Sequence, residues 1–171
     1  VDRLLPKKYG AFHSLSFKPS TKLELGLYEG IIFHRNTGFE LNYLNPLMFY
    51  HSIEHTIGSA DNVFMGFQAK YNINESAQFY GQLLLDDLQV GQLVQGTGWW
   101  GNKYGIQLGG HFVNIFKINQ LDAQLEFNMV RPYTYSHYGP GNTDTLDNFT
   151  HYNQPLAHPF GANFMEIYGR L

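Results

Sequence analysis

The sequence predicts an all-β fold, namely an antiparallel transmembrane β-barrel to which this chain contributes about seven strands, with a short helix in a long loop. Two observations support this prediction. Candidate strands of about ten residues alternate apolar and polar side chains, and a period of two is typical of strands. The connections between them alternate between short and long, as they do in barrels that cross an outer membrane.

The composition narrows the class of protein without deciding it. Charged residues make up 15% and aromatic residues 16% of the chain, whereas an average soluble domain has about 25% charged residues. The formal net charge of −3 and the lack of a Lys/Arg cluster argue against a nucleic-acid partner. The absence of cysteine excludes disulfides, thiol nucleophiles and cysteine metal sites. No apolar run is long enough for a membrane-spanning helix.

The candidate strands carry their charge on one face. They cover residues 11–17, 22–33, 61–72, 77–87, 103–113, 121–129 and 161–171. In the third to sixth of these, one face is uncharged, as with Phe79 and Leu83, which alternate with Gln78 and Gln82. Glu29 is the exception in the second strand. It should lie near a rim, because an ionised side chain at mid-bilayer depth costs a few kcal/mol.

A soluble β-sandwich would show the same alternation, with the apolar face as its core. Three features favour lipid instead. The polar face is rich in amides, namely Gln68, Gln78, Gln82, Gln107 and Gln124. Tyr71, Tyr104 and Phe112 lie near strand ends on the apolar face, where interfacial aromatic girdles occur. The alternation of loop lengths has no cause in a sandwich.

The odd number of strands predicts that residues 1–171 form a single domain that is the C-terminal part of a larger barrel. Bacterial single-chain barrels have even strand numbers. An open sheet in lipid would leave its edge backbone groups without hydrogen bonds. Strands outside this sequence are the simplest solution, and an eighth strand in the weakly patterned regions is the alternative.

The connection 34–61 is expected to contain the short helix, since Asn45 suits an N-cap, Pro46 a first helical position and Gly58 a C-terminal stop. His51 and His55 lie four residues apart with Glu54 between them, a spacing that can hold zinc. Structural histidines are the favoured interpretation. We therefore predict no metal and no cofactor.

The connections 87–102 and 131–160 carry the candidate ligand-binding residues, because aromatic rings stack on sugars and amides, imidazoles and guanidinium groups bond hydroxyls. These residues are Trp99, Trp100, Arg131, Tyr133, Tyr135, His137, Tyr138, His151, Tyr152, Asn153 and Gln154. The tandem Trp pair fits an interfacial anchor equally well. The last connection, with a flexible stretch at 139–147, is alternatively a loop folded into the lumen and hydrogen-bonded to its wall.

No catalytic residue is predicted. Ser136, His137 and Asn153 could form a lipase-like trio, but no pattern in the sequence brings them together. His137, His151 and His158 are a further set that an outer-membrane enzyme or metal site would use.

Several segments resemble the capsule-assembly Wzi-like outer-membrane proteins of Bacteroidota, a family that includes RemB-like gliding-motility proteins. They are 44–50 (LNPLMFY), 58–63 (GSADNV), 78–87 (QFYGQLLLDD), 98–103 (GWWGNK), 130–137 (VRPYTYSH) and 150–159 (THYNQPLAHP). The resemblance implies a large barrel at the cell surface that is non-catalytic and holds capsule or exopolysaccharide, or supports gliding and adhesion. Asp144, Thr145 and Leu146 also resemble a Bacteroidota O-glycosylation acceptor, with Thr145 as the modified residue.

The expected function is therefore that of a non-enzymatic outer-membrane barrel with its long loops outside the cell. Its expected partners are the lipid bilayer, surface polysaccharide and other envelope proteins. The main alternative is a structural subunit of a larger secretion or nutrient-uptake assembly, with the loops as protein contacts. A diffusion porin has the amide-lined lumen in its favour and the bulky loops against it.

Overall fold

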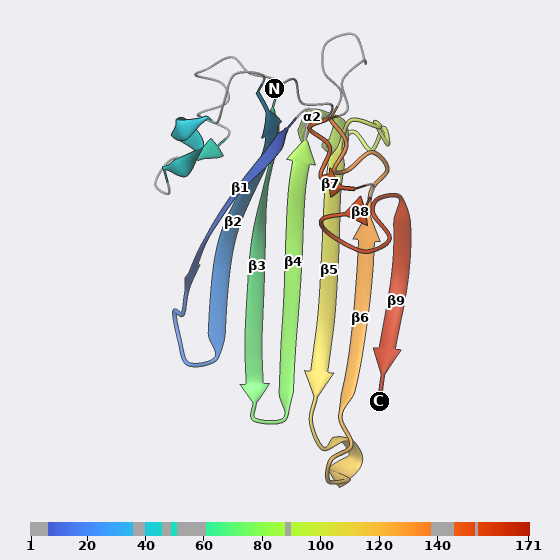
Figure 1. Ribbon diagram of the computed structural model, residues 1–171. Coiled ribbons are helices and arrows are strands. Elements are labelled where there is room, and N and C mark those ends of the chain that lie inside the picture. Colours follow the sequence, from blue (N-terminus) through green and yellow to red (C-terminus); the bar gives the residue numbers. More distant parts are fainter. Residues whose placement is uncertain are drawn as a thin grey trace.

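The computed structural model describes residues 7–35, 40–45, 49–50, 61–87, 90–137, 146–152 and 154–171. In these residues, seven long strands form one antiparallel sheet in the order β1-β2-β3-β4-β5-β6-β9 (Figure 1). The strands are β1 (Lys8–Phe17), β2 (Leu23–His34), β3 (Asn62–Asn74), β4 (Ala77–Asp87), β5 (Lys103–Phe112), β6 (Ala123–Val130) and β9 (Phe164–Arg170). The prediction of an all-β antiparallel fold is confirmed. The sheet is open within this chain, with β1 and β9 as its edges.

Short connections lie at one end of the sheet and long ones at the other, as Figure 1 shows and as the sequence predicts. The short connections are residues 18–22, 75–76 and 113–122. The long ones contain elements that the sequence pattern did not indicate: η1 (Leu41–Leu44), α2 (Val90–Val94) and the pair β7 (Thr150–His151) and β8 (Gln154–Pro155). The helix predicted between Pro46 and Gly58 lies mostly outside the described residues.

The strand register aligns side chains of one kind into rows across the sheet. One row contains Leu27, Phe67, Leu83, Ile106, Met129 and Met165. The next row contains Gln68, Gln82, Gln107, Asn128 and Glu166. Because side chains alternate along a strand, these two rows lie on opposite faces. We call the face with the first row the outer face and the face with the second row the inner face.

The outer face is apolar and uncovered over most of its length. Phe67 is 42% exposed, Leu108 56% and Leu125 59%. Leu27, Met65, Leu83 and Ile167 are also exposed. The apolar side chains that the sequence pattern grouped together are therefore not packed into an internal core.

Hydrophobic clusters form only near the loop end within the described chain. On the outer face, Tyr43 and Tyr50 cover Ile31 and Phe33. Glu29 is also buried there, with its Oε2 atom 3.1 Å from His13 Nε2 and accepting the Tyr50 N–H at 3.0 Å. The exceptional acidic side chain on this face is thus buried and contacted through its Oε2 atom.

Phe149 from the last long connection packs on the inner face against Ile32, Phe64 and Leu84. Its ring centre lies 4.6 Å from that of Phe64, at an interplanar angle of 76°. This connection therefore folds back over the loop end of the inner face. None of the helices in the described segments is long and apolar enough to cross a membrane.

A glycine on the inner face makes room for a tyrosine ring. A Cβ atom on Gly66 would lie 2.0 Å from Cζ of Tyr28 and 2.6 Å from the carbonyl oxygen of Leu83. Any side chain at position 66 would collide with the ring and with the neighbouring strand, so the Tyr28 ring can lie flat against the sheet only over glycine.

Candidate functional site

Three aromatic residues from two connections meet at the loop end of β5 and β6. The ring centres of Trp99 and Trp100 are 5.9 Å apart, and those of Trp100 and Tyr133 are also 5.9 Å apart. Trp100 is 62% exposed and Tyr133 51% exposed. We call Trp99, Trp100 and Tyr133 the aromatic cluster. The structure thus brings together residues that the sequence analysis selected separately.

Arg131 holds this cluster in place. Its Nη2 atom donates to the carbonyl oxygens of Gly98 and Trp99, both at 3.2 Å. Its Nε atom donates to the Asn102 carbonyl at 3.3 Å. Its guanidinium carbon also lies 5.7 Å from the ring centre of Tyr104, an outer-face residue. Arg131 therefore braces the Trp99–Trp100 turn at the loop end of the outer face.

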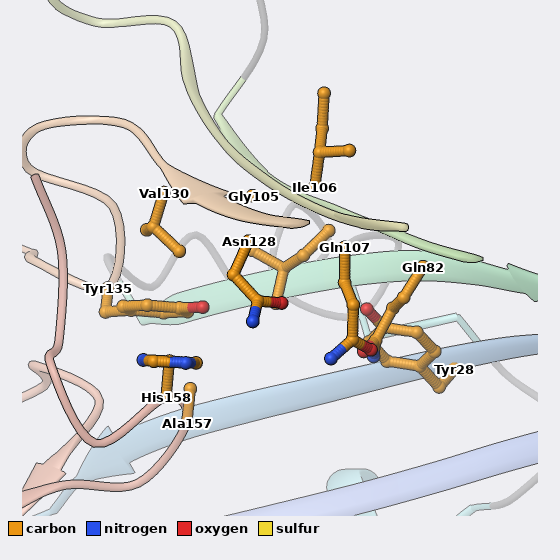
Figure 2. Close-up of a pocket in the computed structure, with 11 residues that line it drawn as sticks. Tyr28, Gln82, Gly105, Ile106, Gln107, Asn128, Val130, Tyr135, Ala157 and His158 are labelled. Carbon is orange, nitrogen blue, oxygen red and sulfur yellow. The ribbon is translucent and has the colours of Figure 1, made fainter. Parts of the chain in front are cut away.

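A cavity lies on the inner face, beneath the connection that follows β6 (Figure 2). Its lining includes Tyr28, Gln82, Gln107 and Asn128 from the sheet. Tyr135 and His158 belong to the connection and line the other side. Figure 2 shows Ile106, a further lining residue, directing its side chain away from this space. Its side chain belongs to the outer face, so only its backbone borders the cavity.

Tyr135 is held firmly above the sheet. Its N–H donates to Oδ2 of Asp86 at 2.7 Å, and its ring centre lies 5.8 Å from that of Phe149. Burial raises the pKa of Tyr135 to about 12, assisted by the negative charge of Asp86. The phenol is therefore neutral at any physiological pH.

His158 is oriented by groups outside the cavity. Its Nδ1 atom accepts the Phe160 N–H at 3.2 Å, and its Nε2 atom lies 3.4 Å from Oε2 of Glu166. Its ring centre is 4.4 Å from that of Phe164. With Nδ1 used as an acceptor, Nε2 carries the proton that faces Glu166.

Asn128 connects the cavity to carboxylates on the inner face. Its Nδ2 atom donates to Oε1 of Glu126 at 2.8 Å and to Oε2 of Glu166 at 3.1 Å. Glu126 also accepts from the Tyr80 hydroxyl at 2.5 Å. These bonds fix the amide orientation, so one floor residue of the cavity is preorganised.

The segment around Asp147 is anchored to the loop ends of β1, β2 and β3. Nδ1 of His34 lies 2.9 Å from both carboxylate oxygens of Asp147, and the Asn62 amide donates to the Asp147 carbonyl at 2.8 Å. Lys8 donates to the carbonyl oxygens of Asn148 and Thr150. Asp147 is buried, whereas the sequence predicts a flexible stretch that extends to this residue.

The remaining candidate residues lie elsewhere. His151, Tyr152 and Gln154 are exposed on or beside the β7–β8 pair, and the His151 and Tyr152 ring centres are 4.3 Å apart. The His137 N–H donates to Oδ1 of Asn148 at 2.7 Å. Tyr138, Asn153 and Thr145 lie outside the described residues. The predicted binding residues are therefore distributed over the aromatic cluster, the inner cavity and the β7–β8 pair.

The alternative metal and nucleophile sites receive no geometric support from the described segments. His51, Glu54 and His55 lie outside them, as does Asn153 of the lipase-like trio. Among the residues that can be placed, no three His, Cys, Asp or Glu side chains come close enough to hold a metal ion.

Sequence reasoning did not select Tyr28 and Asn128 as site residues, and it placed Gln82 and Gln107 only on a polar face. The signal was the recurrence of amides at alternate positions of neighbouring strands. These amides can be recognised as one site only when the strand register is known, because the register aligns Gln82, Gln107 and Asn128.

The chain matches no protein-family model, no curated protein and no solved structure. The resemblance to the Wzi-like family accordingly stays a prediction.

Proposed function

We propose that this chain is part of a non-enzymatic outer-membrane β-barrel whose long connections lie at the cell surface and bind or anchor capsule or exopolysaccharide, or support gliding and adhesion. The observation that carries the proposal is the exposed apolar outer face of the sheet. The opposite face, lined by amides and carboxylates, has the character of a hydrated lumen.

The exposure of this face is unfavourable in water. Each Å² of apolar surface left in water forfeits about 25 cal/mol, and soluble monomers rarely expose contiguous patches above a few hundred Å². Here the exposed side chains run across the sheet from Leu15 on β1 to Ile167 on β9. The described segments provide no second layer that would cover them, whereas lipid would.

The height of the apolar band also suits a bilayer. On β3 it extends from Met65 to Ile73, a length of about nine residues, which a tilted membrane strand requires. Met65 pairs in register with Glu29, so the buried Glu29–His13 contact lies at the loop-side limit of the band. A charge at this level is close to the headgroups, where it is tolerated.

Closure of the barrel requires partners for β1 and β9, the edges of the sheet in this chain. Unpaired backbone groups in lipid cost several kcal/mol each. Further strands must therefore pair with both edges, and the proposal places this sheet within a larger barrel.

The aromatic cluster supports the polysaccharide part of the proposal. Trp100 and Tyr133 expose their rings in a fixed arrangement, and aromatic faces combined with a polar tip suit sugar rings. Trp99, half-buried and beside the Arg131 brace, suits the interfacial anchor. The two interpretations of the Trp pair thus apply to different members of it.

Lipid contact can be tested with single cysteines, because residues 1–171 contain none. Phe67→Cys and Gln68→Cys place neighbouring labels on opposite faces of β3. In the membrane-embedded protein, a spin label at position 67 should be relaxed by oxygen and protected from a water-soluble nickel chelate. The label at 68 should show the reverse. Access of the chelate to both labels would refute the membrane proposal.

The polysaccharide role can be tested on whole cells. The Trp100→Ala, Tyr133→Ala double variant should lose retention of capsule or exopolysaccharide, while Phe116→Ala, an exposed aromatic residue at the short-connection end of the sheet, should retain it. Equal retention by both variants, at equal surface levels of protein, would remove the sugar-binding role of the cluster.

The exposed apolar side chains of the last connection favour a structural subunit as the second candidate function. Leu156 is 46% exposed and Phe160 64% exposed, and both lie outside the outer face. Native purification in detergent decides between the candidates, since a stoichiometric protein partner supports this second function and a lone barrel opposes it.

A further inference from the structure

The inner face contains a cavity that the surface-loop function does not use. Its volume is about 190 Å³. Gln82, Gln107 and Asn128 form its floor, aligned in register on three adjacent strands. Figure 2 shows the amides of Gln107 and Asn128 on the same side of the sheet as the Tyr135 and His158 rings.

The opposite wall is fixed by bonds that lie outside the cavity. Asp86 holds the backbone of Tyr135, while Phe160 and Glu166 orient the imidazole of His158. The rings are thus preorganised before any ligand arrives, which lowers the entropy lost on binding. A water-filled gap in a lumen requires no such arrangement.

The chemistry of the lining combines two kinds of group. Carboxamides and tyrosine hydroxyls can both donate and accept hydrogen bonds. Asn128 already donates to Glu126 and Glu166, and the Tyr28 hydroxyl donates to the Leu83 carbonyl, so these two residues offer acceptor oxygens to a ligand. Leu84, Val130 and the aromatic rings supply apolar surface. A ligand with C–H faces and hydroxyl groups around its edge satisfies both.

The negative charge around the cavity further restricts the class of ligand. Glu126 and Glu166 both bond to Asn128, and no Lys or Arg belongs to the described lining. A carboxylate or sulfate on the ligand would be repelled there. A volume of about 190 Å³ suits a ligand of one ring better than an oligosaccharide.

We propose that this cavity binds a single uncharged sugar ring, seated on the Gln82–Gln107–Asn128 row and bordered by Tyr135 and His158. The class of ligand rests on the proposed polysaccharide function, whereas the cavity itself does not depend on lipid contact. The inference adds a second sugar site, on the inner face, to the aromatic cluster at the surface.

The test uses the full-length protein in a detergent without a sugar headgroup. Methyl glucoside, methyl galactoside, methyl mannoside and glucuronic acid are titrated by calorimetry, with saturation-transfer NMR as a second readout. At least one neutral glycoside should bind with a Kd of about 1 mM or below. Glucuronic acid should bind about tenfold more weakly or not at all.

Two variants probe the cavity by independent means. Gly105→Ala adds a methyl group whose nearest neighbours would be Val130 Cγ2 at 3.4 Å, the Met129 carbonyl oxygen at 3.6 Å and the Tyr135 hydroxyl at 3.8 Å, so it fits while narrowing the space. Gln107→Leu removes the amide at similar size. Each should weaken binding about tenfold, the loss expected for one hydrogen bond or one blocked contact.

Matched controls separate this inference from the proposed function. Gly169→Ala, on the outer face where a Cβ atom meets nothing within 4 Å, should leave affinity unchanged. In the wild-type protein, sugar should shift the ring signals of His158 and not those of His111, which lies at the short-connection end of the inner face; this readout needs no variant to fold. The same His158 shift should persist in Trp100→Ala, because this signal reports the cavity and not the aromatic cluster.

The absence of binding by any neutral sugar, equal affinity for glucuronic acid, or full affinity in both cavity variants would overturn the inference. These outcomes leave the lipid-contact result unaffected. Conversely, chelate access to position 67 would remove the membrane proposal and leave this cavity to be judged by its own titration.

Discussion

Arg35 and Asp61 form a two-point ion pair across the connection between β2 and β3, with Nη1–Oδ1 and Nη2–Oδ2 distances of 2.7 Å. Asp61 is 3% exposed and also accepts the Tyr43 hydroxyl at 2.5 Å. The hydrogen bonds that Arg35 donates to the Asp61 carboxylate raise the pKa of Arg35 above its ordinary value. One buried carboxylate therefore ties the η1 segment to the ends of two strands.

Asp61→Ala should lower the free energy of unfolding by about 3 kcal/mol, because it leaves Arg35 and Tyr43 without their charged partner. Urea titration followed by far-UV circular dichroism measures this. Glu24→Ala is the control, since Glu24 pairs with Lys70 and Lys18 at an accessible position. Equal effects of the two substitutions would show that the buried ion pair contributes no more to stability than the accessible one.

In the proposed membrane barrel, Leu108→Arg should destabilise the protein by about 2–4 kcal/mol, the range for arginine on a lipid face near the bilayer midplane. Gln68→Arg, on the inner face, should fold nearly as well as the wild type, because the proposed hydrated lumen would solvate the charge. The measurement is the urea midpoint of refolding into liposomes, followed by heat-modifiable migration on gels. A larger loss from Gln68→Arg would contradict the assignment of the faces.

Phe149→Ala should release the last connection from the inner face while the sheet stays folded. The buried ring contacts Phe64, Phe12 and Tyr135, and removing such a ring costs about 3–5 kcal/mol. Hydrogen exchange of the Phe149 N–H, which is bonded to the Tyr135 carbonyl at 2.8 Å, reports the opening. Phe160→Ala, at a 64% exposed site, should leave this amide protected.

Tyr135 should make the free energy of unfolding depend on pH in the alkaline range. Burial raises its pKa to about 12, above the value of about 10 in an unfolded chain. The stability that the neutral phenol contributes is therefore fully present below about pH 10 and is lost as the pH rises toward 12. The difference in phenolate absorbance between wild type and Tyr135→Phe during titration should show a midpoint near 12. A midpoint near 10 would contradict the buried position.

The strands and their faces could be predicted because side-chain alternation is a local property. Every long strand of the described sheet falls on a segment selected from its period of two, with ends differing by a few residues. The alternation of loop lengths followed from the same segments. Composition and pattern also separated the apolar from the amide-rich face before any strand was paired.

The tertiary structure alone decided which residues meet. His34 and Asp147 are 113 positions apart, and nothing local to either residue indicates their contact. The division of the candidate binding residues between the aromatic cluster, the inner cavity and the β7–β8 pair depends on how the last connection folds back. Register has the same origin, since cross-strand hydrogen bonds and packing between distant segments set it. The alternation in the sequence predicts the face on which each side chain lies, whereas interactions across the whole sheet determine which residues become its neighbours.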